Sequence, residues 1–226
     1  MAEVKKYHLP PTSKIPNSPF PLLHYPQFFP SPASRAPAAV HDAFAANAWQ
    51  VQWIFRYGPT QQSHYHSAAH ECMAVLSGEA TIRFGVADNE PPGGGGGGGG
   101  GGADGNDSSS SRGIEVHARA GDVFVLPAGL AHKTFHPDPS DSTFKLLTPG
   151  DGHHVPGAGD GSTGPGLAGV ELSGFTMIGA YPIGAKWDFA VGGEHEGRYQ
   201  EVWSVPRPER DPVLGTDPAG LTGLWG

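Results

Sequence analysis

Apolar and polar side chains alternate from residue 49 onward, with one apolar set at Trp49, Val51, Trp53, Phe55 and Tyr57. A period of two residues is that of a strand with one buried face. Shorter apolar runs, separated by Gly, Pro, Asp and Ser, predict further strands at residues 64–66, 73–76, 80–86, 114–118, 123–126, 131–135 and 144–147, and strand character resumes across 170–190. Many short strands with close turns predict an all-β protein, an antiparallel sandwich or barrel.

One segment has helical features instead. Residues 37–48 open with Pro37 in a first-turn position, are rich in alanine, and place Val40 and Phe44 four apart on one face. Before this helix, prolines recur from Pro10 to Pro37, and each lacks a backbone N–H. We therefore expect residues 1–48 to be an extended, surface-lying arm with one short helix and no central strand. A barrel at 49–190 and a proline-rich extension at 191–226 would follow.

Glycine is the compositional outlier, with 35 of 226 residues. The stretch at about 88–112 contains the run Gly93 to Gly102 followed by serines, and it has almost nothing apolar to offset the entropy of ordering it. We predict a disordered insertion in a hairpin. A phosphate-binding loop is disfavoured, because no Lys-Ser/Thr pair and no strand-to-helix context follow. A second glycine-rich stretch, 150–169, is predicted to be a surface loop.

The charge balance excludes whole classes of partner. Lys and Arg number 14 against 22 Asp and Glu, for a formal charge of -8, and no basic run occurs. Nucleic acid is therefore not expected as a partner. No stretch approaches the roughly 18 apolar residues that a bilayer span requires, and no apolar signal segment follows the first lysines. We therefore expect a protein that binds no membrane. With a single cysteine no intramolecular disulfide can form, which fits a reducing compartment, so we expect the protein to be cytoplasmic.

Two separate segments carry metal-ligand chemistry. His64 and His66 are two residues apart, so on a strand both imidazoles would project from the same side. Glu71 could return on the neighbouring strand with an oxygen ligand. His132 follows a strand and a Pro-x-Gly turn, and it could complete the set. Mixed nitrogen and oxygen donors suit first-row divalent metals.

The spacing within these segments is recognisable. Gly58 to Gly78 reads Gly-x5-His-x-His-x4-Glu-x6-Gly, and Gly121 to His132 reads Gly-x5-Pro-x-Gly-x2-His. Together they resemble the two motifs of the cupin superfamily, except that the family's final Asn is replaced by His136. Residues 15–19, 66–71, 127–133 and 179–188 further resemble the YjlB-like group of single-domain cupins found in bacteria and fungi.

This resemblance implies a fold, a ligand set and a class of chemistry. The fold would be a jelly-roll or double-stranded β-barrel with a metal inside. The metal would be a divalent transition ion (Fe, Mn, Ni or Zn) held by His64, His66, Glu71 and His132, with open positions for a substrate or ligand. The implied function is metal-dependent oxidation, decarboxylation or isomerisation of a small organic molecule, as in dioxygenase-like cupins. The alternative is a non-catalytic cupin that binds a metal or small molecule, and no general base is assigned.

Several neighbouring residues have a structural and a functional interpretation. His70 could replace Glu71 as a ligand or orient it, whereas Cys72, opposite in parity, is expected only to pack. We expect surface positions for Lys133, His136, His153 and His154, and support of the barrel mouth by Tyr181, Trp187 and Asp188. Residues 123–126 are apolar on both faces, so either the arm or a second subunit should cover one face. We expect a homodimer.

Overall fold

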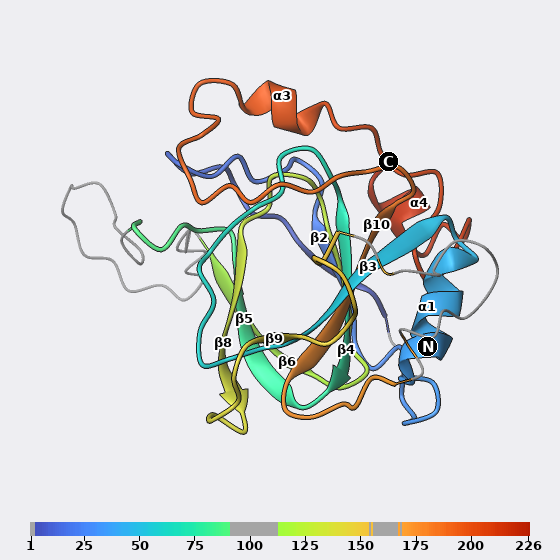
Figure 1. Ribbon diagram of the computed structural model, residues 1–226. Helices are drawn as coiled ribbons and strands as arrows, with labels where there is room; N and C mark the ends of the chain where they lie inside the picture. The colour runs from blue at the N-terminus through green and yellow to red at the C-terminus, as the bar shows by residue number, and fades with distance from the viewer. Residues whose placement is uncertain (1–2, 91–112, 154, 156–166, 168) are drawn as a thin grey trace, which may run out of the picture.

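The computed structural model describes residues 3–90, 113–153, 155, 167 and 169–226 (Figure 1). Two antiparallel sheets form the body of the protein. The larger sheet has the order β1-β2-β7-β4-β10-β3-β9 and consists of Lys5–Tyr7 (β1), Leu22–Tyr25 (β2), Val123–Leu126 (β7), Glu71–Ser77 (β4), Thr176–Pro182 (β10), Trp49–Arg56 (β3) and Lys145–Leu146 (β9). The smaller sheet has the order β6-β5-β8 and consists of Ile114–Arg119 (β6), Glu79–Phe84 (β5) and His132–Asp138 (β8).

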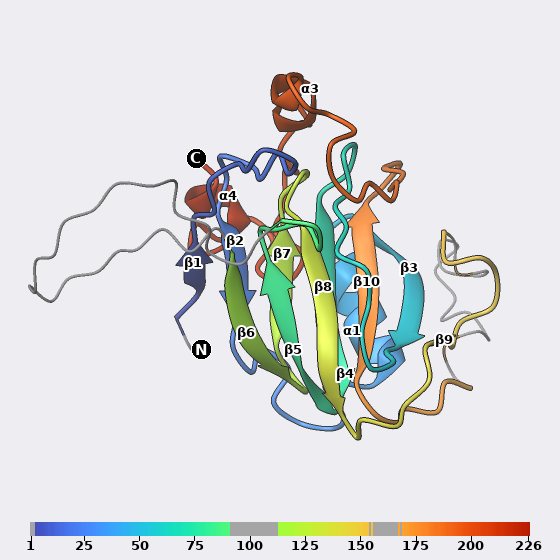
Figure 2. The same cartoon turned by 90° about the vertical axis from the view of Figure 1, so that its left-hand side faces the viewer.

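The two sheets form opposite walls of a barrel, as the jelly-roll expectation requires (Figures 1 and 2). The smaller sheet faces the viewer in Figure 2, and helix α1 (Pro37–Ala45) lies on the outer side of the larger one. Two short helices, α3 (Tyr199–Trp203) and α4 (Leu221–Leu224), belong to the C-terminal segment. Among the residues described, no helix is long and apolar enough to cross a bilayer.

Strand β4 shows how the period of two divides the core. Met73 and Val75 point into the barrel, where they join Ile82 of the smaller sheet in one apolar cluster. Cys72 and Ala74 point outward and pack in a second cluster. Both clusters are buried, so a strand that is apolar on both faces is explained within one chain.

The same division explains residues 123–126. Phe124 and Leu126 belong to the barrel interior, whereas Val123 and Val125 belong to the outer cluster. The outer cluster also contains side chains of the arm, of α1 and of the C-terminal segment, among them Leu23, Phe44 and Trp225. The chain itself therefore covers this face, and the homodimer stays a prediction.

Most strand positions predicted from the pattern are confirmed, with shifted ends. Residues 64–66 are different, because they form only isolated bridges, His64 to His132 and Tyr65 to Ala190. Helix α1 ends three residues earlier than predicted, at Ala45. The predicted insertion at 88–112 lies outside the described residues except for Asp88, Asn89 and Glu90, and so does much of the predicted loop at 150–169.

The expectation that the proline-rich arm contains no central strand is wrong at one place. Strand β2 lies between β1 and β7 and pairs with both. Its four residues lie between Pro21 and Pro26, so none of them lacks an N–H group. A proline-free window of four residues is enough to enter the sheet.

Indole groups of late residues tie the arm to the far end of the chain. Trp225 Nε1 donates to the carbonyl of Pro21 at 2.8 Å, and Trp203 Nε1 donates to that of Asn17 at 2.9 Å. The carboxylate of Asp211 accepts a hydrogen bond from the Tyr25 hydroxyl and another from Leu221 N. These contacts hold the arm and the C-terminal segment together.

Candidate metal centre

Backbone pairing brings the two histidine segments together. His64 N donates to the carbonyl of His132 at 3.1 Å, and His132 N donates to that of His64 at 2.8 Å. The carbonyl of His66 accepts from Gly129 N in the Pro-x-Gly turn at 2.8 Å. Gly129 has φ +86, and a Cβ there would lie 2.8 Å from Val202 Cγ1, so the turn requires glycine.

The three histidines present one nitrogen each to a common point. Ligand atoms of His64, His66 and His132 all lie within 4.8 Å of one another, and the three side chains are buried. These three buried histidines could therefore bind a metal ion.

The opposite ring nitrogens are held by the backbone. Nδ1 of His64 faces the carbonyl of Gln62 at 3.0 Å, and Nδ1 of His132 faces that of Leu130 at 3.4 Å. Nδ1 of His66 faces the carbonyl of Asp188. Because a carbonyl only accepts, each Nδ1 must carry the proton, and a neutral ring then has a free lone pair on Nε2. Second partners of this kind orient the histidine ligands of metal sites.

Glu71 closes the group from strand β4. Its Oε1 lies 3.3 Å from His66 Nε2, and its Oε2 lies 3.3 Å from His132 Nε2. Oε1 also accepts a hydrogen bond from the Tyr181 hydroxyl, whereas Oε2 has no hydrogen-bond donor among the described residues. Lone pairs that face a carboxylate at this distance repel unless a proton or a cation lies between them. The donor set therefore fits a divalent cation.

Burial and the contacts between Glu71 and the imidazoles together set the protonation of this group. Burial lowers the pKa of His64 well below its ordinary value and that of His132 to about 4, so both rings are neutral at pH 7. For His66 burial acts in the same direction, but the Glu71 carboxylate outweighs it and raises the pKa. Burial would raise the pKa of Glu71, yet the neighbouring imidazoles lower it to about 2, so this carboxylate is ionised.

A cavity of about 150 Å³ opens onto these four side chains. Its remaining walls are mostly aromatic and come from β3, β10 and the segments around 144 and 188. They are formed by Trp53, Phe55, Tyr57, Gln61, Phe144, Tyr181, Trp187 and Phe189. The indole of Trp53 donates to the Tyr181 hydroxyl at 3.1 Å, so Tyr181 is itself held in place while it donates to Glu71.

His70 lies elsewhere. Its Nδ1 accepts from Ala128 N at 3.0 Å, and its Nε2 faces the carbonyl of Pro206 at 3.2 Å. It packs beside the ring of Trp225, with ring centroids 5.0 Å apart. His70 thus connects the Pro-x-Gly turn to the C-terminal segment, and it neither joins the histidine cluster nor touches Glu71 through any contact described here.

Other residues with two interpretations are resolved by their surroundings. Cys72 is buried in the outer cluster, on the opposite side of β4 from Glu71. His136 is exposed, and Lys133 is partly buried with Nζ 2.7 Å from Asp88 Oδ1. His153 is exposed and stacks on Trp187. His154 lies outside the described residues.

The segment 187–190 has a larger part in the site than its sequence indicates. The carboxylate of Asp188 accepts from Ser67 N at 2.6 Å and from Ser67 Oγ at 2.7 Å, while its carbonyl faces His66. Phe189 stacks on the His64 ring with centroids 4.0 Å apart. The alternation Trp53, Phe55, Tyr57 could have indicated an aromatic wall, but no pattern in the sequence marks Phe144 or Phe189.

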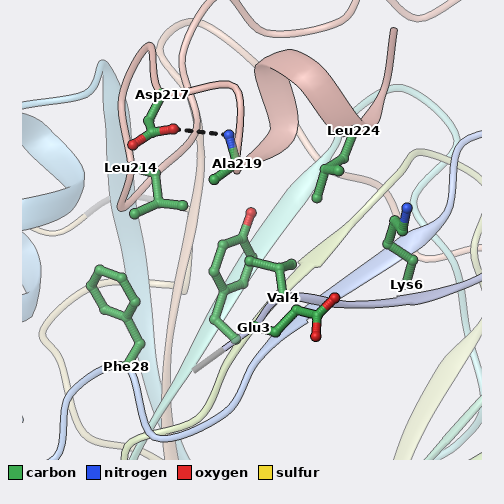
Figure 3. Close-up of a pocket in the computed structure, with 9 residues that line it drawn as sticks. Glu3, Val4, Lys6, Phe28, Leu214, Asp217, Ala219 and Leu224 are labelled. Atoms are coloured by element: carbon green, nitrogen blue, oxygen red, sulfur yellow. Dashed lines mark hydrogen bonds between the residues drawn. The ribbon is translucent and has the colours of Figure 1, made fainter. Parts of the chain in front are cut away.

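A larger cavity, about 380 Å³, lies between β1 and the C-terminal segment (Figure 3). It is lined by Glu3, Val4, Lys6, Tyr25, Phe28, Leu214, Asp217, Ala219 and Leu224. None of these described residues is a histidine or cysteine, and the charges Glu3, Lys6 and Asp217 do not form a donor cluster. The larger cavity therefore lacks metal-ligand side chains among its described residues, whereas the smaller cavity at the histidine cluster has them.

The two motifs, the two-sheet barrel and the buried histidine cluster define a cupin. Consistently, residues 58–153 match the family model described as Cupin. It is similar over 219 residues to "Uncharacterized protein YjlB" of Bacillus subtilis (strain 168), with 24% identity over 94% of this chain and 92% of the relative. The chain is thus a YjlB-like cupin.

Solved structures with detectable likeness are remote. Vicilin from Corylus avellana (hazelnut) has 14% identity and a TM-score of 0.32, with 74% of this chain and 30% of the vicilin covered. The hydroquinone 1,2-dioxygenase PnpCD, solved with Cd2+ and 4-hydroxybenzonitrile, has 13% identity and a TM-score of 0.28, with 61% and 59% covered. The chain spans less than two thirds of either one, and no equivalence of sites follows from TM-scores this low.

Proposed function

We propose that this protein binds a divalent transition metal through His64, His66, Glu71 and His132 and uses it on a small organic molecule held in the barrel. The observation that carries this proposal is the orientation of the three imidazoles. Each Nδ1 faces a backbone carbonyl, so the three Nε2 atoms converge beside an ionised carboxylate. Fe, Mn, Ni and Zn all accept this combination of donors.

The chain supplies the surroundings that such a metal needs. When bound, a divalent cation would act as a Lewis acid on a substrate oxygen. Tyr181 holds Glu71 through its hydroxyl, and the aromatic walls keep bulk water away from the donors. The proposed class of reaction is oxidation, decarboxylation or isomerisation. None of the other described cavity residues is an Asp, Glu, Lys or His that could serve as a general base.

The proposal is tested by the metal content of the protein purified without added metal. Elemental analysis by mass spectrometry should find close to one divalent transition metal per chain. His66→Ala and His132→Ala should each lose the metal and keep the far-ultraviolet circular dichroism of the wild type. His117→Ala is the matched control, because His117 is exposed on β6 and should be without effect.

Two results would contradict the proposal. One is a wild-type protein without metal even after incubation with Fe(II), Mn(II), Ni(II) or Zn(II) and removal of the excess. The other is unchanged metal content in both histidine variants. A protein that holds stoichiometric metal but converts none of a panel of acids, sugars and phenols would support the non-catalytic binding role instead.

A further inference from the structure

We propose that the ligand of this cavity is a single-ring aromatic molecule with one hydroxyl group, of the phenol class. Its oxygen would face the histidine cluster, and its ring would lie among the aromatic side chains of the barrel mouth. This inference rests on the proposed metal function and names the class of molecule that the metal would act on.

The size of the cavity favours one ring. Its volume is about 150 Å³. An apolar cavity of ~150 Å³ engineered into another protein stays dry and binds benzene. A two-ring molecule, or a hexose with its hydroxyl groups and their water, would extend beyond this volume into the solvent-exposed mouth.

The walls match the face and the edge of an aromatic ring. Phe55 and Phe144 stack with centroids 4.9 Å apart and an angle of 23° between their planes. Trp187 lies 5.3 Å from the His66 ring, and Phe189 stacks on His64. Aromatic rings prefer such offset-stacked and tilted neighbours, so another ring would find partners of both kinds here.

Two large apolar side chains that line this cavity are exposed to solvent. Among the described residues, three large hydrophobic side chains are exposed, namely Phe144 at 56%, Ile183 at 69% and Phe189 at 49%. Phe144 and Phe189 both line the cavity. An apolar ligand would cover part of their surface, which gives their exposure a role in binding.

The charge of the site disfavours acids with two carboxylates and phosphates. None of the described lining residues is Lys or Arg, and Glu71 is the one carboxylate among them. A divalent cation with ionised Glu71 leaves one positive charge, which a single phenolate would neutralise. A second anionic group would stay unpaired in an environment poor in water, where charges are costly.

The cavity has few polar groups. Apart from the indoles and the four candidate ligands, only Gln61, Tyr57 and Tyr181 are polar among its described lining residues. A sugar would need hydrogen-bond partners for several hydroxyl groups, whereas a phenol needs partners for one.

The test measures binding rather than turnover. The metal-loaded protein is titrated with phenol, cyclohexanol and succinate by calorimetry, and the metal content of every sample is determined. Phenol should bind about two- to tenfold more tightly than cyclohexanol, because an aromatic contact contributes about 0.5–1.5 kcal/mol beyond apolar burial. Succinate should bind more weakly than either one.

Variants locate the binding site. Phe144→Ala and Phe189→Ala should each weaken phenol binding about three- to tenfold. Ile183→Ala is the matched control, because Ile183 is equally exposed but does not line the cavity, and its affinity should be unchanged. Phe28→Ala tests the larger cavity of Figure 3 and should also have no effect.

The outcomes separate this inference from the proposed function. If the protein retains metal but prefers succinate, fails to distinguish phenol from cyclohexanol, or loses phenol affinity only in Phe28→Ala, the ligand class is wrong and the metal site stands. Equal phenol affinity in both phenylalanine variants and the wild type also overturns it. A protein that holds no metal removes the basis of both proposals.

Discussion

Gly179 is expected to be indispensable, because the indole of Trp53 lies directly over it. The two residues are cross-strand partners in β10 and β3. A Cβ built on Gly179 would lie 2.0 Å from both Cε2 and Cζ2 of Trp53. Carbon atoms in contact prefer about 3.5–4.0 Å, so the indole would have to move by roughly 1.5 Å.

That movement would be costly and would reach the candidate metal centre. Trp53 is buried, and overpacking a tight core typically costs about 1–3 kcal/mol, so we expect Gly179→Ala to lose about 3 kcal/mol of unfolding free energy. The indole would also leave the Tyr181 hydroxyl, which holds Glu71. Metal affinity should therefore fall as well.

Urea unfolding followed by circular dichroism measures the first effect, and metal content measures the second. Gly169→Ala is the control, because no atom of the described residues lies within 4 Å of a Cβ at Gly169. A double-mutant cycle identifies the cause: Trp53→Leu removes the clashing ring, so the double variant should be about 2 kcal/mol more stable than additivity predicts. Additive losses, or a Gly179→Ala protein within about 0.5 kcal/mol of the wild type, would refute the reasoning.

Two further predictions concern buried groups outside the cavity. His70→Ala should lose about 2–3 kcal/mol of unfolding free energy, because it leaves the buried Ala128 N–H without an acceptor. The metal content should stay unchanged. Loss of metal with unaltered stability would instead make His70 a ligand. Burial would raise the pKa of Asp122, but hydrogen bonds with His24 and Gln27 outweigh it and lower the pKa. A lowered carboxyl pKa stabilises the folded state above the ordinary value and loses this contribution as the pH falls below it. The stability gap between wild type and Asp122→Asn in urea unfolding should therefore be full at pH 7 and shrink below about pH 4, and a constant gap down to pH 3 would contradict this.

The sequence predicted the donor atoms of the site better than their supports. His64, His66 and Glu71 could be found from the spacing of the motif, although residues 64–66 form isolated bridges instead of the expected strand. The carbonyls of Gln62, Leu130 and Asp188 orient the imidazoles, but every residue has a carbonyl, so composition and spacing say nothing about them. Phe189 reaches the site only because Tyr65 bridges to Ala190, a pairing between distant residues without a local pattern.

For the fold, local patterns predicted a strand correctly where the alternation of its own side chains indicates which of its faces is buried. Strand β2 could not be predicted in this way, because its place depends on pairing with β1 near the start of the sequence and with β7 near its middle. The number of prolines in the arm indicates how many backbone N–H groups are missing there. The four residues of β2 nevertheless contain no proline, and they are enough to pair with both neighbouring strands. Residues 123–126 predicted that the arm or a second subunit covers one face, and the arm does cover it, together with α1 and the C-terminal segment.

The indole hydrogen bonds that join the arm to the C-terminal segment have a consequence for how the chain folds. Carbonyls near residues 17 and 21 receive their donors from Trp203 and Trp225, so the earliest part of the polypeptide must wait for the last. Pairings between such distant residues are slow to form, because loop-closure entropy is lost before any contact is gained. During synthesis, the arm should stay accessible to chaperones and proteases until residue 225 has left the ribosome.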